Sequence, residues 1–129
     1  MNPSPDLRDR LLALYRAMSS GDADAVEAFY SLEAGSVFIG TGDAEFWTDS
    51  ARHNADVRHF FDGRSGVISW NPGDALSLVE GSVGWTVDRP TLYLPSAEVL
   101  RLRLSLVWRR EDGVWKVVHS HASLGPAPG

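Results

Sequence analysis

The stretch VWKVVHSHAS, residues 114–123, is expected to form the last β-strand of the chain. Because a strand repeats every two residues, five side chains are expected on one face: Trp115, Val117, His119, His121 and Ser123. Two imidazoles beside an apolar tryptophan and valine indicate a pocket on that face. The stretch by itself names neither a ligand nor a reaction.

The preceding strand, expected at residues 98–109, has its leucines on a single face. That face should be buried, and it carries Leu100, Leu102, Leu104, Leu106 and Trp108. A two-residue hairpin turn at Asp112-Gly113 would place Leu106 opposite His119. The same register places Leu104 opposite His121, so the histidines share the leucine-lined side. A three-residue turn with a glycine bulge would shift the register by one residue and turn the histidines to the other face.

Two helices are expected before any strand. The first begins after the N-cap Ser4, with Pro5 as the first helical residue, and ends near Gly21. Its apolar stripe consists of Leu7, Leu11, Leu14, Tyr15 and Met18. A short second helix follows the cap Asp22 and runs to about Tyr30.

A third helix is expected to begin at Thr48 or Asp49 and to end at Asp62-Gly63. Its buried side should consist of Trp47, Ala51, Ala55, Val57, Phe60 and Phe61. His53 and His59 lie on this helix six residues apart, a spacing that does not place them on one face. They are therefore expected to be surface or packing residues.

The remaining segments show the period of strands, at about residues 36–40, 67–70, 75–87, 92–94, 98–109 and 114–123. Helices followed by strands predict an α+β fold, with three helices packed on a strongly curved antiparallel sheet that has a mixed edge. The 129 residues are expected to form a single domain, in which residues 1–4 and 125–129 are flexible tails.

The composition of the chain argues against some classes of binding partner. A formal charge of -5, with lysine and arginine scattered along the chain, removes the electrostatic basis for binding nucleic acid or an anionic membrane. No apolar run approaches the ~20 residues that span a bilayer. Because the chain contains no cysteine, its function must rest on side chains with oxygen and nitrogen atoms. A cytoplasmic, soluble protein is expected.

Three segments carry a family resemblance: FIGTGDAEFW at 38–47, VGWTVDRPTLYLP at 83–95 and RLRLSLVWRREDGVWKVVHSHAS at 101–123. They resemble the SnoaL-like branch of the nuclear transport factor 2-like superfamily, over nearly the whole chain. The ending GVWKVVHSHAS is also similar to the end of the calcium/calmodulin-dependent kinase association domain in the same superfamily. The resemblance implies a cone with a central pocket between the helices and the concave sheet face.

The resemblance also implies a homodimer formed through the outer face of the sheet. That face should carry Arg101, Arg103, Ser105, Ser120 and Ala122, which is more polar than most obligate interfaces.

Cyclases and isomerases that resemble this fold use a pocket carboxylate or histidine to move a proton next to a carbonyl group. The matching positions here are His119 and His121, with Asp88 as an orienting or proton-accepting partner. Asp43 or Glu45 could serve from the loop before the third helix. In the alternative interpretation, both histidines bond their neighbours and fill the polar end of the fold.

The wall of the pocket for a small, largely apolar ligand is expected to comprise Trp47, Phe60, Trp85, Leu104 and Leu106. A histidine-x-histidine strand can hold a metal, but two ligands are too few, and no further ligand follows His121 at a suitable spacing. No metal and no cofactor are expected.

Two classes of function remain open at this point. One is a small-molecule protein, either a binder or an isomerase, cyclase or lyase acting by proton transfer. The other is a non-enzymatic dimerisation or partner-binding domain. An enclosed pocket containing His119 and His121 would favour the first, whereas a filled cone and a broad apolar outer surface would favour the second.

Overall fold

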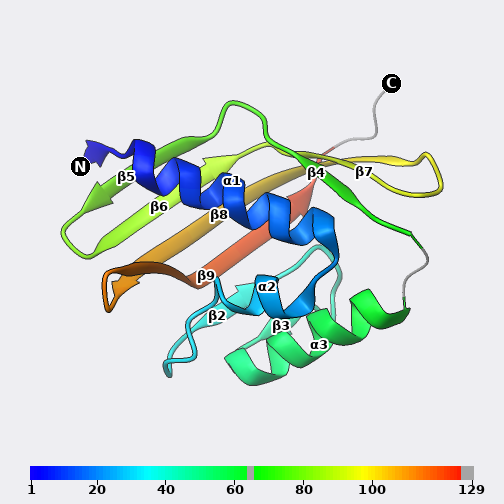
Figure 1. Ribbon diagram of the computed structural model, residues 1–129, viewed down its shortest axis with the longest axis horizontal. Coiled ribbons are helices and arrows are strands. Elements are labelled where there is room, and N and C mark those ends of the chain that lie inside the picture. Colours follow the sequence, from blue (N-terminus) through cyan, green and yellow to red (C-terminus); the bar gives the residue numbers. More distant parts are fainter. Residues whose placement is uncertain (64–65, 126–129) are drawn as a thin grey trace.

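Three helices cover one side of a curved, mixed sheet in the computed structural model, which describes residues 1–63 and 66–125 (Figure 1). The helices are α1 (Pro5–Ser20), α2 (Ala23–Glu27) and α3 (Ser50–Gly63). The strands are β1 (Asn2–Pro3), β2 (Val37–Ile39), β3 (Phe46–Trp47), β4 (Ser69–Asn71), β5 (Leu76–Glu80), β6 (Val83–Asp88), β7 (Thr91–Tyr93), β8 (Val99–Glu111) and β9 (Val114–Leu124). The predicted α+β architecture is confirmed.

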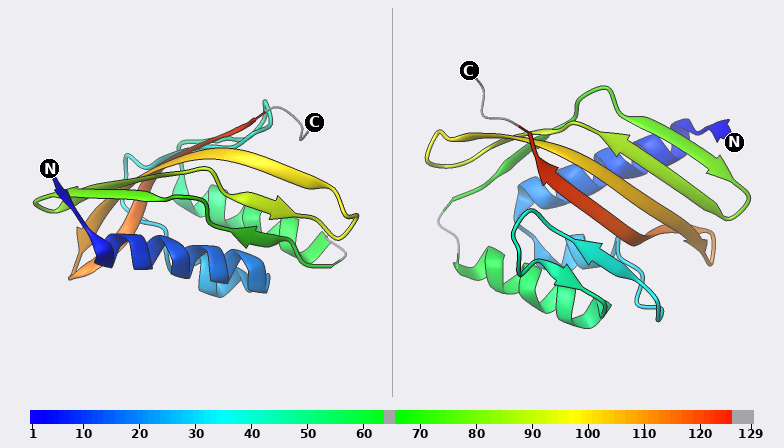
Figure 2. Two further views of the ribbon diagram at one scale, coloured as in Figure 1. Left: turned by 90° about the horizontal axis from the view of Figure 1, so that it is seen from above. Right: turned by 180° about the vertical axis from the view of Figure 1, so that it is seen from behind.

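The sheet runs in the order β1-β5-β6-β8-β9-β2-β3, and β7 pairs with both β4 and β8. All strand pairs are antiparallel except β2 with β9, which is parallel. The sheet bends over the helices, so that its concave side faces them, and none of the described helices lies on its convex side, the outer face (Figure 2). The expected mixed edge is therefore present, at β2.

Local signals determine α1. The Ser4 side chain accepts a hydrogen bond from the Leu7 amide at 3.1 Å, and Pro5 is the first helical residue. At the other end Gly21 adopts a left-handed conformation with φ 71°, which a residue without Cβ tolerates. Both predicted ends are confirmed.

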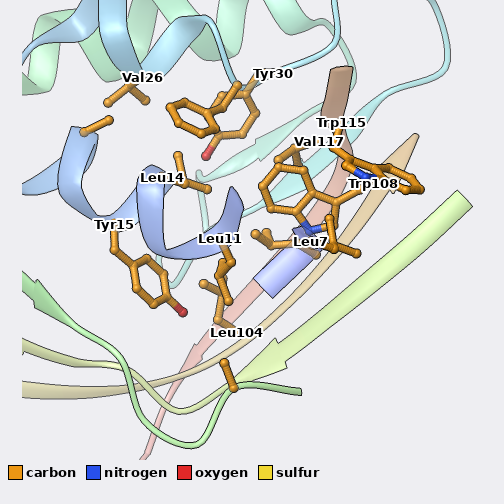
Figure 3. Packing of buried hydrophobic residues seen from close by; sticks show 14 of the residues in the cluster. Leu7, Leu11, Leu14, Tyr15, Val26, Tyr30, Leu104, Trp108, Trp115 and Val117 are labelled. Carbon is orange, nitrogen blue, oxygen red and sulfur yellow. The ribbon is translucent and has the colours of Figure 1, made fainter. Parts of the chain in front are cut away.

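The core forms where the leucine stripe of α1 meets the concave face of β8 (Figure 3). Leu7, Leu11 and Leu14 are almost fully buried there, as is Trp108. The Trp108 indole donates a 3.0 Å hydrogen bond to the Thr86 hydroxyl, which satisfies its only polar atom. Each such buried side chain contributes about 1.5–3 kcal/mol of transfer free energy. The space between α1 and the concave face of β8 is therefore filled with side chains, and we call it the filled end of the cone.

The predicted order of elements is wrong at the N-terminus. Asn2–Pro3 forms β1 and pairs with Leu78 and Val79 of β5, so a strand precedes the helices. The amide of Ser4 continues this contact by donating to the Ser77 carbonyl at 3.1 Å. Of the expected C-terminal tail, only Gly125 lies within the described residues.

The expected run at residues 75–87 is two strands, because Gly81, at φ 61°, turns the chain between β5 and β6. The second helix is also shorter than predicted. It ends at Glu27, and the backbone at Tyr30 forms an isolated parallel bridge with Val117 of β9.

The predicted buried side of α3 is partly wrong. Ser50, His53 and Asn54 are its buried residues, whereas Ala51, Ala55 and Phe60 are exposed. Val57 and Phe61 are half-buried, as a position on the covered side requires. The helix is rotated in this way because His53 lies among the rings of Tyr30, Phe38 and Trp47, with centroids 4.7, 4.4 and 5.0 Å away. Trp47 itself belongs to β3.

The hairpin between β8 and β9 has the expected two-residue turn, since Glu111 pairs with Val114 across Asp112-Gly113. The register then holds as far as Trp108 and Val117. Beyond them a β-bulge at Val118 shifts it, so that Val107 pairs with His119. The predicted pairing of Leu106 with His119 is therefore wrong.

The bulge lies where β9 changes its neighbour on the other edge. The Val117 carbonyl accepts from the Ser31 amide at 2.9 Å, and the Val117 amide donates to the Phe29 carbonyl at 2.8 Å. Two residues later, at His119, the neighbour becomes β2. One extra residue joins the two pairings, and it reverses the faces of all later side chains of β9.

Candidate functional site

His119 and His121 point to the outer face of the sheet, away from the helices. They pair with Val107 and Ser105, which alternate with the buried leucines of β8. Ser120 pairs with Leu106 and faces the concave side in their place. The expectation that the histidines lie beneath the helices is thus wrong, and whether either takes part in a reaction stays a prediction.

The histidines line an open groove of about 390 Å³ on the outer face. The residues that line it are Val87, Asp88, Arg89, Arg103, Leu104, Ser105, His119, His121 and Ser123. The ring of His119 is held by a 2.8 Å contact between Nδ1 and the Val37 carbonyl. Because a carbonyl only accepts, Nδ1 carries the hydrogen and Nε2 remains for another partner.

The carboxylate of Asp88 does not face the histidines. Its Oδ2 accepts a 2.8 Å hydrogen bond from the hydroxyl of Tyr15 on α1, inside the cone. The amides of Gly73 and Arg89 also donate to it, at 3.1 and 2.7 Å. Burial, together with the charge of Asp88 and the bond to it, raises the pKa of Tyr15. Three donors satisfy the carboxylate, and Asp88 does not complete an acid/base set with His119 or His121.

The five residues predicted to form a pocket wall do not surround one space. Leu104 and Leu106 are buried in the core, and Trp85 lies on the outer face, paired with Val107. Phe60 is exposed on α3. Trp47 is half-buried and donates to Asp56 at 2.7 Å, next to His53. Their roles in ligand binding stay predictions.

His53 was expected to be a surface or packing residue, and it is a packing residue, 5% exposed. Its Nδ1 lies 3.2 Å from the amide oxygen of Asn54. Burial lowers the pKa of His53, although the contact with Asn54 and the charge of Asp56 act in the opposite direction. The fold therefore favours the neutral imidazole. The apolar residues Phe38 and Trp47 that surround it come from two separate strands, and their convergence is a property of the fold.

A second open cavity, of about 590 Å³, lies between α2, α3 and the turn of the β8–β9 hairpin. Its lining is largely acidic: Asp24, Glu27, Ala28, Tyr30, Leu32, Glu33, Asn54, Glu111 and Lys116. Arg58 forms ion pairs with Asp24 and Glu27, which offsets much of this charge. Within the described residues, no group of three or more potential ligands is arranged to hold a metal ion.

The carboxylates of Asp43 and Glu45, in the loop before α3, do not line the groove either. Glu45 folds back on its own loop, where its side chain accepts from the Gly42 amide at 2.6 Å, and Asp43 is exposed. Neither faces His119 or His121 across a described cavity.

The outer face of the sheet carries a band of largely apolar side chains that extends beyond β8 and β9 to the neighbouring strands. The strand registers place two rows side by side across the sheet. They consist of Leu78, Trp85, Val107, His119 and Val37, and of Leu76, Val87, Ser105, His121, Ile39 and Phe46. The predicted outer residues Ser120 and Ala122 face inward instead, because of the bulge at Val118. The outer face is therefore more apolar than the sequence predicted, and we call these two rows the outer band.

Exposure along the concave side of β9 rises toward its end. Val117 is fully buried, Ser120 and Ala122 are half-buried, and Leu124 is 48% exposed. The helices therefore leave the last residues of this concave face only partly covered.

Of the described helices, none is long and apolar enough to cross a membrane.

Several solved structures share this fold. An NTF2-like protein of unknown function from Pseudomonas putida KT2440 has a TM-score of 0.84 at 16% identity, covering 95% of this chain and 89% of that one. A proposed dehydratase of the NTF2-like family from Streptomyces avermitilis has a TM-score of 0.80 at 16% identity, covering 94% of both chains. A proposed calcium/calmodulin-dependent protein kinase II association domain from Xanthomonas campestris has a TM-score of 0.76 at 14% identity, covering 98% and 90%. At these identities the likeness is one of fold.

No curated protein shows a significant match to the sequence. The family model of the SnoaL-like domain, in contrast, matches residues 7–128. That match includes both α1 and the β8–β9 hairpin, so it covers the elements that build the cone. The chain therefore belongs to the SnoaL-like domain family, as its three motif segments predicted.

Proposed function

We propose that this chain is a self-associating SnoaL-like domain, in which two copies meet through the outer band of the sheet. The observation that carries the proposal is the apolar character of that band. Leu76 is 65% exposed and Phe46 is 60% exposed, and Val87 lies next to Leu76 with 42% of its surface exposed. Large apolar side chains gathered on one face of a monomer are typical of an interaction surface.

The arrangement of the outer band resembles a protein interface. Apolar residues, Trp85 among them, form most of its two rows, and Ser105, His119 and His121 lie in the middle of the rows. The arginines Arg103 and Arg109 lie on the adjoining rows. Tryptophan and arginine are the residues that contribute most often to binding energy at interfaces. A two-fold symmetric contact would use the same band on both copies.

The filled end of the cone supports the same conclusion. Trp108 and Leu106 are buried in the core, and neither lines one of the two described cavities. The structural neighbour from Xanthomonas campestris is named for association, which agrees with assembly on this fold.

The test is the oligomeric state of two matched variants, measured by light scattering after size-exclusion chromatography. Leu76→Glu places a charge in the outer band, whereas Leu32→Glu places it at a leucine that is 75% exposed and lies outside the sheet. The unmodified protein and Leu32→Glu should have the mass of a dimer, and Leu76→Glu that of a monomer. A monomeric unmodified protein, or a dimeric Leu76→Glu, would contradict the proposal.

A second candidate is the binding of a small apolar molecule at the partly covered end of the concave face. Its support is the rise in exposure from Ser120 to Leu124. Trp70, Phe61 and Ala122 are partly buried side chains that pack against the same core. An apolar ligand would complete the burial of these side chains. Tyr15 and Asp88 bond each other, so we propose binding here without turnover.

This candidate is tested with 2-decanone, followed by tryptophan fluorescence. Saturable quenching is expected in the unmodified protein. Ala122→Phe should abolish it by filling the space beside β9, while leaving the mass of the assembly unchanged, because Ala122 is on the concave side. Quenching that survives Ala122→Phe would place the ketone elsewhere.

A further inference from the structure

The groove on the outer face differs in charge from the rest of the molecule. The chain has a formal net charge of -5, yet the side chains that line this groove include two arginines, two histidines and two serines. Asp88 is the single acidic residue of the lining; the residue is 4% exposed, and its carboxylate is bonded inside the cone. The groove is therefore a local concentration of hydrogen-bond donors and positive charge.

The two guanidinium groups have unused donors. Arg103 donates from Nε to the hydroxyl of Ser123 at 3.0 Å, and its Nη atoms make no hydrogen bond or ion pair within the described residues. The side chain of Arg89 likewise makes none with the part of the chain that the structure describes. A guanidinium presents its donors as a planar fork, which matches the two oxygens of a carboxylate or phosphate.

Neighbouring groups hold two of these side chains in place, Arg103 and His119. The bond to Ser123 fixes the orientation of Arg103, and the Val37 carbonyl fixes the ring of His119. Less side-chain freedom is lost on binding when donors are already oriented. Ser105 and His121 are cross-strand partners between these two positions, and both are exposed.

We propose that this groove binds a small oxyanion, the carboxylate or phosphate group of a metabolite, between Arg89, Arg103 and His121. The groove is complete in one copy of the chain. Its lining shares Val87, Ser105, His119 and His121 with the outer band, so an anion and a second copy of the chain would compete for these residues. Its volume of about 390 Å³ holds an anion with a short organic portion, which the adjoining Val87 contacts.

The experiment is a titration of the isotope-labelled protein followed by amide NMR shifts, at constant ionic strength set with sodium chloride. One arm uses inorganic phosphate and the other uses succinate. Saturable shifts are expected at residues 103–105 and 119–123. A response to phosphate alone assigns a phosphate group, a response to succinate alone assigns a carboxylate, and either supports the proposal.

Two variants test whether binding is specific to the groove. Arg103→Gln should weaken binding about tenfold or more, because a charge-assisted hydrogen bond is lost. Arg101→Gln removes the same charge from the same strand outside the groove lining and should change binding less than about twofold. Arg89→Gln repeats the first test if the spectrum of Arg103→Gln shows a disturbed fold.

The proposal is overturned if neither anion saturates below about 50 mM, a concentration typical of nonspecific attraction. It is also overturned if Arg101→Gln weakens binding as much as Arg103→Gln does. The mass of the protein is measured in the same samples. A monomer that binds the anion contradicts only the self-association. If the protein is a dimer that fails to bind, the titration is repeated with the monomeric Leu76→Glu variant, and failure to bind there overturns the groove alone.

Discussion

Tyr15 of α1 and Asp88 of β6, 73 residues apart in the chain, are joined inside the cone by a 2.8 Å hydrogen bond. Because Asp88 also accepts from the Gly73 amide, one carboxylate connects the first helix, the loop before β5 and the end of β6. The arrangement satisfies a buried charge with three donors, as such a charge requires. We therefore expect this pair to stabilise the fold.

Tyr15→Phe should lower the free energy of unfolding by about 1–2 kcal/mol, because it removes one donor and leaves the buried carboxylate with two. Urea denaturation measures the change. Tyr93→Phe is the matched control, since Tyr93 is half-exposed on β7, and it should alter stability by less than about 0.5 kcal/mol. Equal effects of the two substitutions would show that the bond to Asp88 adds nothing to stability.

Gly73→Ala should also destabilise the protein, by about 1–3 kcal/mol. An added Cβ would lie 2.7 Å from the Arg89 carbonyl oxygen and 2.9 Å from Oδ1 of Asp88, so the loop would have to move. Gly63→Ala meets no atom within 4 Å at the end of α3 and should be neutral or stabilising by up to about 1 kcal/mol. Melting temperatures of the two variants make the comparison, and a neutral Gly73→Ala would mean that the loop adapts.

Deletion of Ser120 should be far more harmful than deletion of Val118. Without Ser120, one imidazole must pair with the buried Leu106, that of His121 if the bulge stays and that of His119 if it is lost, at a cost of about 1–3 kcal/mol. Deletion of Val118 removes only the extra residue of the bulge, so His119 still pairs with Val107 and the faces of β9 are kept. Chemical denaturation of both proteins tests this, and similar stabilities would show that the register does not determine the faces of β9.

Stability should fall as the pH is lowered past the range in which histidine titrates. The folded pKa of His53 is lowered by burial, so between the folded and unfolded pKa values the unfolded chain binds more protons. The free energy of unfolding then decreases as the pH falls below about 6.5, and this contribution is fully present above that pH.

His53→Phe keeps an aromatic ring among Tyr30, Phe38 and Trp47 but cannot be protonated. Urea denaturation at about pH 7.5 and about pH 5 should therefore show a smaller loss of stability in this variant than in the unmodified protein. His59→Phe, at an exposed position of the same helix, is the control and should retain the full loss. If both variants lose as much stability as the unmodified protein, His53 is not the group responsible.

The elements that could be predicted from sequence are those fixed by nearby residues. α1 follows from the Ser4 cap, the proline at its first position and a leucine stripe at helical spacing. The turn at Asp112-Gly113 follows from a dipeptide that tolerates positive φ at both positions, here 50° and 80°. In each case a few consecutive residues carry the whole signal.

The faces of β9 could not be predicted in this way, because the bulge arises from the neighbours of the strand. The segment at Phe29 and Ser31 bonds Val117, and β2 takes over at His119. One local signal was present: the apolar residues Ala122 and Leu124 are out of phase with Trp115 and Val117. A change of phase within a strand indicates a bulge between the two sets.

The candidate site was misplaced for the same reason. A shift of one residue moved both histidines from the concave side to the outer face, where they join Arg103. The outer band was missed because it spans several strands, and the positions of β5, β6 and β2 across the sheet follow only from the complete strand order.

The parallel pairing of β2 with β9 has a consequence for how the chain folds. The contact between Val37 and His119 spans 82 residues, and β9 is the last described strand to emerge during synthesis. Until β9 arrives, β2 lacks its parallel partner, and β8 has an unpaired edge. Loops this long close slowly, so the sheet should form late and in one cooperative step. The nascent chain must therefore keep an apolar, strand-forming surface from aggregating for most of its synthesis.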